Sequence, residues 1–301
     1  MLQKHLVQEF KGSHHLDEMS RYHLGSGGKC LRGRLAMSEA KARNLEHEPA
    51  LHWAMACELL HNATLIHDDI QDHDPIRRGQ ASLWKKYGVS QAINAGDLLI
   101  FKSFSIASQL NNADLVQLLA ETSELLVRGQ CDELKSLEFQ PHGTWNSYQE
   151  MAKLKTGTLF KLPIHGIHLL CGLENNQNEL DAWLELGVCY QIFDDIRDFL
   201  GLKQKGQKQK DFVEGRLNAL VSQIAEMVPH KDLVKEYQEV EAHSYEQQEI
   251  IGEINQIIIE NHLVEKLKRM AEEKLVFFKN NTQKGSQDIV LEFIHGATQK
   301  G

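Results

Sequence analysis

Apolar residues recur with the period of an α-helix along most of this chain of 301 residues. One face of the stretch before Asp68 is wholly apolar and carries Met55, Leu59, Ala63 and Ile66. Another face of the same stretch carries His61, Leu65, Asp68 and Asp72. A second set of positions lines up in the same way, namely Leu184, Val188, Gln191 and Asp195. These patterns predict long helices, each burying one side.

Turn-forming residues separate the helical segments. They are Gly25-Ser26-Gly27-Gly28, Asp74-Pro75, Pro141-His142-Gly143 and Glu174-Asn175-Asn176. Pro163 lies inside a helical pattern and predicts a kink there. Residues 232–280 predict two further helices, and residues 289–294 predict a short last one. Because no linker-like segment interrupts the pattern, we expect one all-α domain over residues 1–301.

Composition narrows the class of protein. The net charge is −9 and no basic stripe is present, so we expect no nucleic-acid partner. The 5 cysteines are odd in number and include no C-x-x-C pair, which favours a reducing compartment over a disulfide framework or a zinc site. No apolar run approaches the roughly 20 residues of a membrane span, and the polar N-terminus has no signal-like core. We therefore expect a cytoplasmic protein without a membrane span.

Two copies of the pattern Asp-Asp-x-x-Asp stand far apart, at Asp68-Asp69-x-x-Asp72 and Asp194-Asp195-x-x-Asp198. On a helix the first and fifth positions stack one turn apart, so each copy presents at least two carboxylates on one face. Like charges this close require water, cationic side chains or metal ions. Carboxylates without His or Cys indicate Mg²⁺, which commonly binds one or two carboxylates and substrate phosphates. Two such clusters facing each other would bind a diphosphate.

Cationic residues accompany the first cluster. Arg77-Arg78-Gly79 follows it directly and suits a diphosphate bound across metal ions. Upstream, Gly27-Gly28-Lys29-x-x-Arg32 places a lysine and an arginine about one turn apart, which forms a second anion site. His61 precedes Asp68 by two helical turns on the same face, so it can reach the same ligand.

Other polar residues accompany the second cluster. Lys155-Thr156-Gly157 offers a cation and a hydroxyl group, and Gln191 offers an amide one turn before Asp194. Each of these residues alone has an ordinary structural explanation, as a packed histidine, a surface charge or a loop. Their joint occurrence favours a functional site.

This set of motifs resembles the trans-prenyl diphosphate synthases, also called the polyprenyl synthetase family. The resemblance runs from about residue 25 to about residue 220. It rests on motifs in the same order, which are Gly-Gly-Lys-x-x-Arg at 27–32, the run His61–Asp72, Arg77-Arg78-Gly79, Gly96-Asp97, Gly129-Gln130-x-Asp132, Lys155-Thr156-Gly157 and Gln191–Asp198. The resemblance implies a single large helical bundle around a central cavity, as in isoprenoid synthases. It also implies Mg²⁺-dependent condensation of isopentenyl diphosphate with an allylic diphosphate, and a homodimer.

The resemblance assigns roles to the residues that match. Mg²⁺ on the allylic diphosphate, about three ions with substrate bound, would be held by Asp68, Asp69, Asp72 and Asp194, supported by Asp195 and Asp198. The same diphosphate would contact Arg77, Lys155, Thr156 and Gln191. Isopentenyl diphosphate would contact Lys29, Arg32, His61 and Arg78. Among these, we expect the catalytic residues to be Asp68, Asp72, Lys155 and Asp194.

The chain departs from the family pattern at several positions. Cys30 replaces an arginine and Gly33 replaces a proline in the Gly-Gly-Lys turn, and Arg216 stands where a lysine is common. Residues 203–210 contain more lysines than the family pattern, with a shifted glycine. Ala63 and Thr64 stand where bulky side chains limit product length in relatives. The floor of the cavity, where the growing prenyl tail would lie, is therefore predicted to be open. This favours geranylgeranyl diphosphate as the product, with farnesyl or a longer product as alternatives.

Three other functions fit parts of the sequence. A di-iron bundle needs two Glu-x-x-His pairs, and Glu58-x-x-His61 and Glu292-x-x-His295 are present, but this function leaves both Asp clusters unexplained. A class I terpene cyclase would share the first cluster but normally mixes Asn, Ser and Glu in the second. A non-catalytic relative with the same fold is the third possibility, and the intact clusters argue against it.

Overall fold

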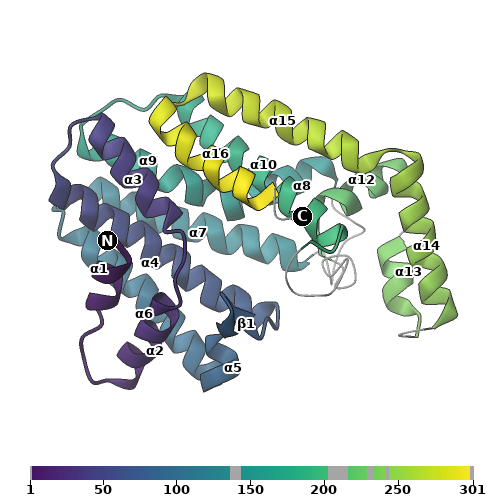
Figure 1. The fold of residues 1–301 in the computed structure, drawn as a ribbon, viewed down its shortest axis with the longest axis horizontal. Helices are drawn as coiled ribbons and strands as arrows, with labels where there is room; N and C mark the ends of the chain where they lie inside the picture. Colours follow the sequence, from purple (N-terminus) through teal and green to yellow (C-terminus); the bar gives the residue numbers. More distant parts are fainter. Residues whose placement is uncertain (1, 136–143, 203–215, 229–232, 242–243, 299–301) are drawn as a thin grey trace. The chain divides into compact units, whose positions relative to one another are not determined.

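A computed structural model describes residues 2–135, 144–202, 216–228, 233–241 and 244–298 of the chain. Within these ranges the regular structure is helical, apart from one hairpin of two very short strands (Figure 1). The predicted all-α fold is therefore confirmed. Among the described residues, none of the helices combines the length and the apolar character that crossing a bilayer requires.

The chain divides into two compact units. The first unit comprises Met1–Ser123 and Lys161–Asn175, and the second comprises Glu124–Phe160 and Asn176–Gly301. The helices α7 (Ala113–Lys135) and α9 (Thr158–Leu170) contribute residues to both units. The expectation of one domain over residues 1–301 stays a prediction.

The first unit is built around the helix that carries the first Asp cluster. That helix is α4 (His47–Gln71). Besides α4 and parts of α7 and α9, the unit contains α1 (Leu2–Gln8), α2 (His15–Gly25), α3 (Leu31–Ala42), β1 (Ile76–Arg77), β2 (Gln80–Ala81), α5 (Leu83–Tyr87) and α6 (Val89–Ser108). Helix α4 packs against α6 and α3 (Figure 1). The predicted apolar face of α4 is buried, including Ala63 at 0% exposure, and the face with His61 and Asp68 is half-buried. Both predicted faces of α4 are thus confirmed.

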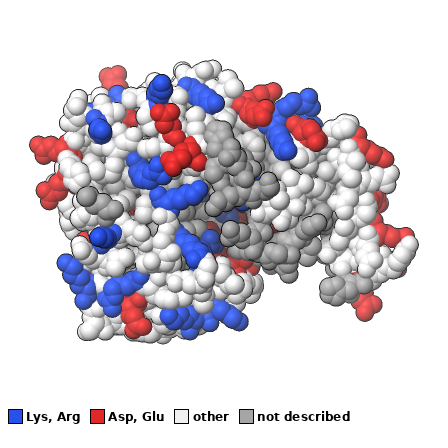
Figure 2. All heavy atoms as spheres, viewed as in Figure 1, with Lys and Arg blue, Asp and Glu red and all other residues white. Residues whose placement is uncertain are grey.

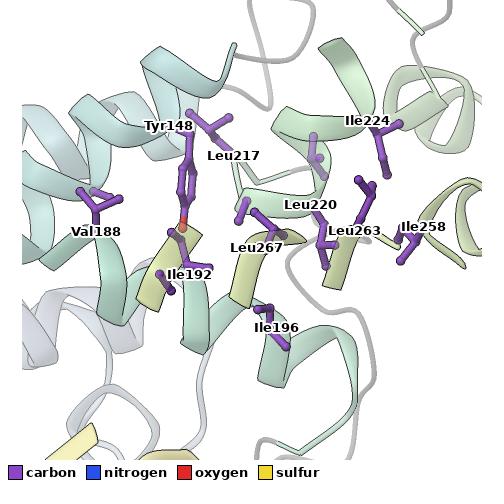
Figure 3. Packing of buried hydrophobic residues seen from close by; sticks show 14 of the residues in the cluster. Tyr148, Val188, Ile192, Ile196, Leu217, Leu220, Ile224, Ile258, Leu263 and Leu267 are labelled. Carbon is purple, nitrogen blue, oxygen red and sulfur yellow. The ribbon is translucent and has the colours of Figure 1, made fainter. Parts of the chain in front are cut away.

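The second unit centres on the helix with the second Asp cluster. That helix is α10 (Gln177–Phe199). Besides α10 and parts of α7 and α9, the unit contains α8 (Trp145–Ala152), the π-helical turn η1 (Lys153–Gly157), α12 (Ala219–Met227), α13 (Leu233–Glu239), α14 (Tyr245–Glu260), α15 (Leu263–Asn281) and α16 (Lys284–Thr298). Helix α10 packs against α15 and η1. Figure 3 shows the core between these helices, where Val188, Ile192 and Ile196 of α10 lie among apolar side chains of α12, α14 and α15.

Several expectations about helix boundaries are wrong. The described residues between 233 and 281 form three helices, α13, α14 and α15, where two were expected. His262, in a left-handed conformation, separates α14 from α15. The last helix, α16, is longer than residues 289–294. The β1–β2 hairpin was not expected at all. Pro163 lies inside helix α9, as expected, and the kink there stays a prediction.

Two observations concern composition. All five cysteines are free, and Cys57 and Cys189 are buried core residues. Acidic and basic side chains are interspersed on the face that Figure 2 shows.

Candidate active site

The first Asp cluster lies at the C-terminal end of α4. Asp68 and Asp72 are half-buried, whereas Asp69 is 1% exposed. The Nε atom of Arg77 donates to Oδ1 of Asp69 at 2.9 Å, and Nη2 of Arg77 donates to the same oxygen. Burial alone would lower the pKa of Arg77, but the bond to Asp69 and the charges of Asp69, Asp68 and Asp72 raise it. The middle aspartate therefore fixes Arg77 beside the cluster.

The hairpin after α4 carries both arginines. Arg77 pairs with Gln80 across it, so Arg78 and Gly79 form a two-residue loop, with φ of 52° and 80°. Helix α2 holds the hairpin in place: the hydroxyl of Tyr22 donates to the carbonyl of Ala81 at 2.9 Å, and Nε2 of Gln80 donates to the carbonyl of Tyr22 at 3.2 Å.

A buried glutamate organises the Gly-Gly-Lys turn. Cys30 precedes α3 in a left-handed conformation and gives the helix no side-chain cap. Instead, Oε1 of Glu58 on α4 accepts from the backbone N–H of Gly33 at 2.9 Å. Glu58 thereby satisfies a free donor of the first turn of α3, and its burial raises its pKa. Proline at Gly33, the residue usual in the family, would lack that N–H.

Arg32 and His61 meet beside this turn. Nη1 of Arg32 lies 3.1 Å from Nε2 of His61. Burial and the charges of Arg32, Arg78 and Arg77 lower the pKa of His61 well below its usual value, so the ring is neutral. Because a guanidinium can only donate, Nε2 accepts and Nδ1 carries the proton. Among the described residues, Nδ1 of His61 has no hydrogen-bond partner. A buried donor group without a protein partner thus lies near Arg32 and Arg78.

The remaining first-unit predictions lie close to these residues in the chain. Lys29 is exposed at the turn that holds Gly27 and Gly28. Ala63 belongs to the buried face of α4, and Thr64 is half-buried and donates to the carbonyl of His61 at 2.8 Å. Thr64 is four residues before Asp68 and so shares its face of the helix.

Lys155 of the second unit lies in η1, a local irregularity of a kind that is frequent at functional sites. Nζ of Lys155 forms an ion pair with Oε2 of Glu133 from α7, and Glu133 is 6% exposed. The close approach of α7 and η1 depends on Gly129, where a Cβ atom would lie 2.7 Å from the backbone nitrogen of Lys155. The sequence analysis missed Glu133, although it immediately follows Gln130-x-Asp132.

A chain of hydrogen bonds joins η1 to the second cluster. Oγ1 of Thr156 donates to Oε1 of Gln191 at 3.2 Å, and Nε2 of Gln191 donates to Oδ1 of Asp195 at 3.0 Å. Oδ2 of Asp195 then accepts from the backbone N–H of Ala219, the first residue of α12, at 2.8 Å. The predicted residues Thr156, Gln191 and Asp195 are therefore connected, and they also hold the start of α12.

The other two aspartates of the second cluster differ in exposure. Asp194 is half-buried, and Asp198 is buried next to a small pocket that Asn218 also lines. Tyr148 of α8 is fully buried beside α10 (Figure 3), and the nearby Asp195 and Asp194 add to the effect of burial in raising its pKa. Arg216 is buried just before α12. The lysines of residues 203–210 lie outside the described residues.

The first cluster belongs to the first unit and the second cluster to the second. That they face each other stays a prediction.

A family model described as polyprenyl synthetase matches residues 13–256 of the chain. The chain belongs to the polyprenyl synthetase family. Its resemblance to that family, inferred from the motifs, is thus confirmed.

Relatives of this chain include two archaeal proteins. A geranylgeranyl diphosphate synthase of Methanosarcina mazei is 34% identical over 215 residues, which are 68% of this chain and 66% of that protein. A short chain isoprenyl diphosphate synthase of Methanocaldococcus jannaschii is 32% identical over 212 residues, 67% of this chain and 64% of that protein. The matched part of the chain thus spans slightly less than two thirds of the length of these relatives.

Solved structures agree on the fold. A decaprenyl diphosphate synthase from Rhodobacter capsulatus superposes with a TM-score of 0.83 at 20% identity, over 99% of this chain and 95% of that one. A heptaprenyl diphosphate synthase from Staphylococcus aureus gives 0.83 at 21% identity, over 100% and 96%. At this identity the likeness establishes the isoprenoid-synthase fold.

The carboxylate groups of the two acidic clusters are chemically suited to bind Mg²⁺. Each cluster supplies carboxylate oxygens, the ligand type this ion prefers. Asp68 and Asp72 lie one turn apart and are both partly accessible, as is Asp194. Asp69 and Asp195 already accept hydrogen bonds from Arg77 and from Ala219. The residues best suited to hold Mg²⁺ are therefore the outer aspartates of the first cluster and the first aspartate of the second.

Proposed function

We propose that this protein is a trans-prenyltransferase that joins isopentenyl diphosphate to an allylic diphosphate, namely dimethylallyl, geranyl or farnesyl diphosphate. The observation that carries the proposal is the donor-rich site of the first unit. Arg32 and Arg78 lie near a neutral His61 whose buried N–H has no partner among the described residues, and Arg77 adjoins the carboxylates of the first cluster. Arginine side chains can bind a diphosphate directly, and carboxylates can bind one through bridging metal ions.

The chemistry proposed breaks the bond between the allylic carbon and the diphosphate oxygen. Negative charge then grows on the leaving diphosphate, where Arg77 and Lys155 stabilise it by charge and Thr156 and Gln191 by hydrogen bonds. Bound Mg²⁺ would add Lewis-acid stabilisation of that same charge. Lys29, Arg32, His61 and Arg78 hold isopentenyl diphosphate, whose double bond attacks the allylic cation. The proton lost afterwards passes to the departed diphosphate, so no side-chain base is needed.

The finer assignments belong to the same proposal. Asp68, Asp72 and Asp194 bind Mg²⁺, with Asp69, Asp195 and Asp198 in support. Ala63 and Thr64 leave room for a product of geranylgeranyl length, and the alternatives are farnesyl or a longer chain. We further propose a cytoplasmic homodimer.

One incubation series tests this function. Labelled isopentenyl diphosphate is supplied with Mg²⁺ and each allylic primer in turn, and products are separated by chain length. We expect elongated prenyl diphosphates that require both substrates and disappear when EDTA is added. If a primer is converted to hydrocarbon without using isopentenyl diphosphate, the protein is a terpene cyclase. If no primer is consumed at all, it is a non-catalytic relative.

A further inference from the structure

Arg78 has a backbone conformation that its turn does not favour. Two-residue hairpin loops with positive φ at both positions prefer Asn-Gly or Asp-Gly, and a long side chain in the left-handed region costs about 1 kcal/mol. Arg78 nevertheless has a φ of 52°. Contacts of its side chain help to offset that cost.

Three residues from other elements surround the Arg78 guanidinium. Nη2 of Arg78 donates to Oδ1 of Asn62, on α4, at 3.3 Å. A Cβ atom at Gly28 would lie only 3.0 Å from Cζ of Arg78, so the guanidinium packs against bare backbone at the Gly-Gly-Lys turn. His23 of α2 is 3% exposed and is close enough for the charges of Arg78 and Arg77, added to burial, to lower its pKa to about 3.

His23 and Asn62 also interact with each other. A side-chain hydrogen bond between them partly offsets the decrease in the pKa of His23. Nδ2 of Asn62 donates a hydrogen bond to the carbonyl of Glu58 at 2.7 Å. This bond orients the amide so that Oδ1 faces the arginine. The oriented amide of Asn62 therefore holds Arg78, and the neutral His23 lies next to that amide, while the Arg78 side chain as a whole stays exposed.

This arrangement is suited to preorganisation. A free arginine side chain loses about 2 kcal/mol of rotamer entropy when it is fixed on a ligand. A guanidinium already held in place loses less on binding, which strengthens the binding of an anion. His23 lies outside the motifs that carry the family resemblance, and Asn62 is an unspecified position between His61 and Leu65 in the run His61–Asp72.

We propose that His23 and Asn62 are positioning residues that hold the Arg78 guanidinium ready for the diphosphate of isopentenyl diphosphate. The inference rests on the proposed function, since it assumes that Arg78 binds this substrate. It predicts a defect mainly in the binding of that substrate, because Arg77 is held by Asp69 and not by Asn62.

The test compares His23→Phe and Asn62→Ala with the wild-type protein. Calorimetry with isopentenyl diphosphate alone, without primer, measures binding without turnover. We expect Kd to rise about tenfold in each variant, which corresponds to about 1.4 kcal/mol. In the steady state KM for isopentenyl diphosphate should rise equally, with KM for the allylic primer and kcat changed less than about twofold. Ser20→Ala is the matched control, since Ser20 lies one turn before His23 on α2 and bonds only within that helix.

A double-mutant cycle separates positioning from general damage. If Asn62 acts through Arg78, Asn62→Ala should add no further loss in an Arg78→Ala background. Full additivity of the two losses, or an unchanged Kd in both single variants, overturns the proposal. A wild-type protein that binds isopentenyl diphosphate but never condenses it overturns the proposed function instead, and leaves the Kd comparison valid.

Discussion

Neighbouring aspartates within each acidic motif have different surroundings. Asp69 is buried against Arg77, and Asp195 is buried against Gln191 and the start of α12. Asp68, Asp72 and Asp194 are half-buried and more accessible to an ion. Helical spacing explains this, because adjacent residues point about 100° apart. In both motifs the second aspartate is buried and supports the fold around the site, whereas the first aspartate is half-buried.

This difference predicts that one substitution mainly lowers activity and a similar one mainly lowers stability. Asp68→Asn should lower kcat by orders of magnitude with little change in stability, because it removes a proposed metal ligand and keeps the size of the side chain. Asp69→Asn should lower the free energy of unfolding by about 2 kcal/mol, since Arg77 loses its charged partner. Urea titration and steady-state kinetics on both variants measure this. Equal stability of the two variants would contradict the structural role of Asp69.

Product length provides a second residue-scale prediction. Thr64 shares the Asp68 face of α4, and Ala63 is fully buried on the opposite face. Thr64→Phe should shorten the main product with little loss of stability. Ala63→Phe should shorten it only together with destabilisation of about 1–3 kcal/mol, because extra atoms must enter a packed core. Product analysis and thermal melting measure both effects, and unchanged products in both variants would contradict the proposed floor.

At the scale of elements, close helix contacts position the second-unit residues. A Cβ atom at Gly187 of α10 would collide with the backbone of Gly157 in η1. The two glycines therefore let α10 approach η1, and the Thr156–Gln191 hydrogen bond depends on this approach. The sequence contained both glycines, but their contact joins positions far apart in the chain, and periodicity within a helix carries no information about it.

A matched pair of glycine substitutions tests the contact. Gly187→Ala should destabilise the protein and weaken catalysis, because α10 must move away from η1. Gly252→Ala in α14 meets no atom within 4 Å and should be neutral or stabilising by up to about 1 kcal/mol through helix propensity. Melting temperatures and kcat for both variants give the comparison. A Gly187→Ala protein as stable as Gly252→Ala would rule out the proposed tight contact.

Helices and the hairpin differ in how well sequence predicts them. The faces of α4 follow from local spacing and were predicted correctly. The hairpin was missed because Arg78-Gly79 lacks the usual Asn-Gly signal, and its stability depends on Tyr22 from a distant helix. The start of α3 was missed for a similar reason, because its donor is satisfied by Glu58 and not by a local capping residue.

At the scale of the whole molecule, each of the two units carries one acidic motif and a cation that is paired with a buried acid. Arg77 accompanies Asp69 in the first unit, and Lys155 accompanies Glu133 in the second. The sequence revealed the motifs because their chemistry is local. It did not reveal Glu133, His23 or Asn62, because each becomes relevant only through tertiary contacts.

The excess of negative charge in the molecule predicts how ligands affect its stability. The net charge is −9, and repulsion among the clustered carboxylates weakens the folded state. A divalent ion bound with a diphosphate relieves this repulsion and binds only the folded chain. At 100 times Kd such a ligand adds about 2.7 kcal/mol of stability. Mg²⁺ with inorganic pyrophosphate should therefore raise the melting temperature more than either component alone at equal ionic strength. The increase should be much smaller in Asp68→Asn, and an equal increase in that variant would show that the stabilising ion binds elsewhere.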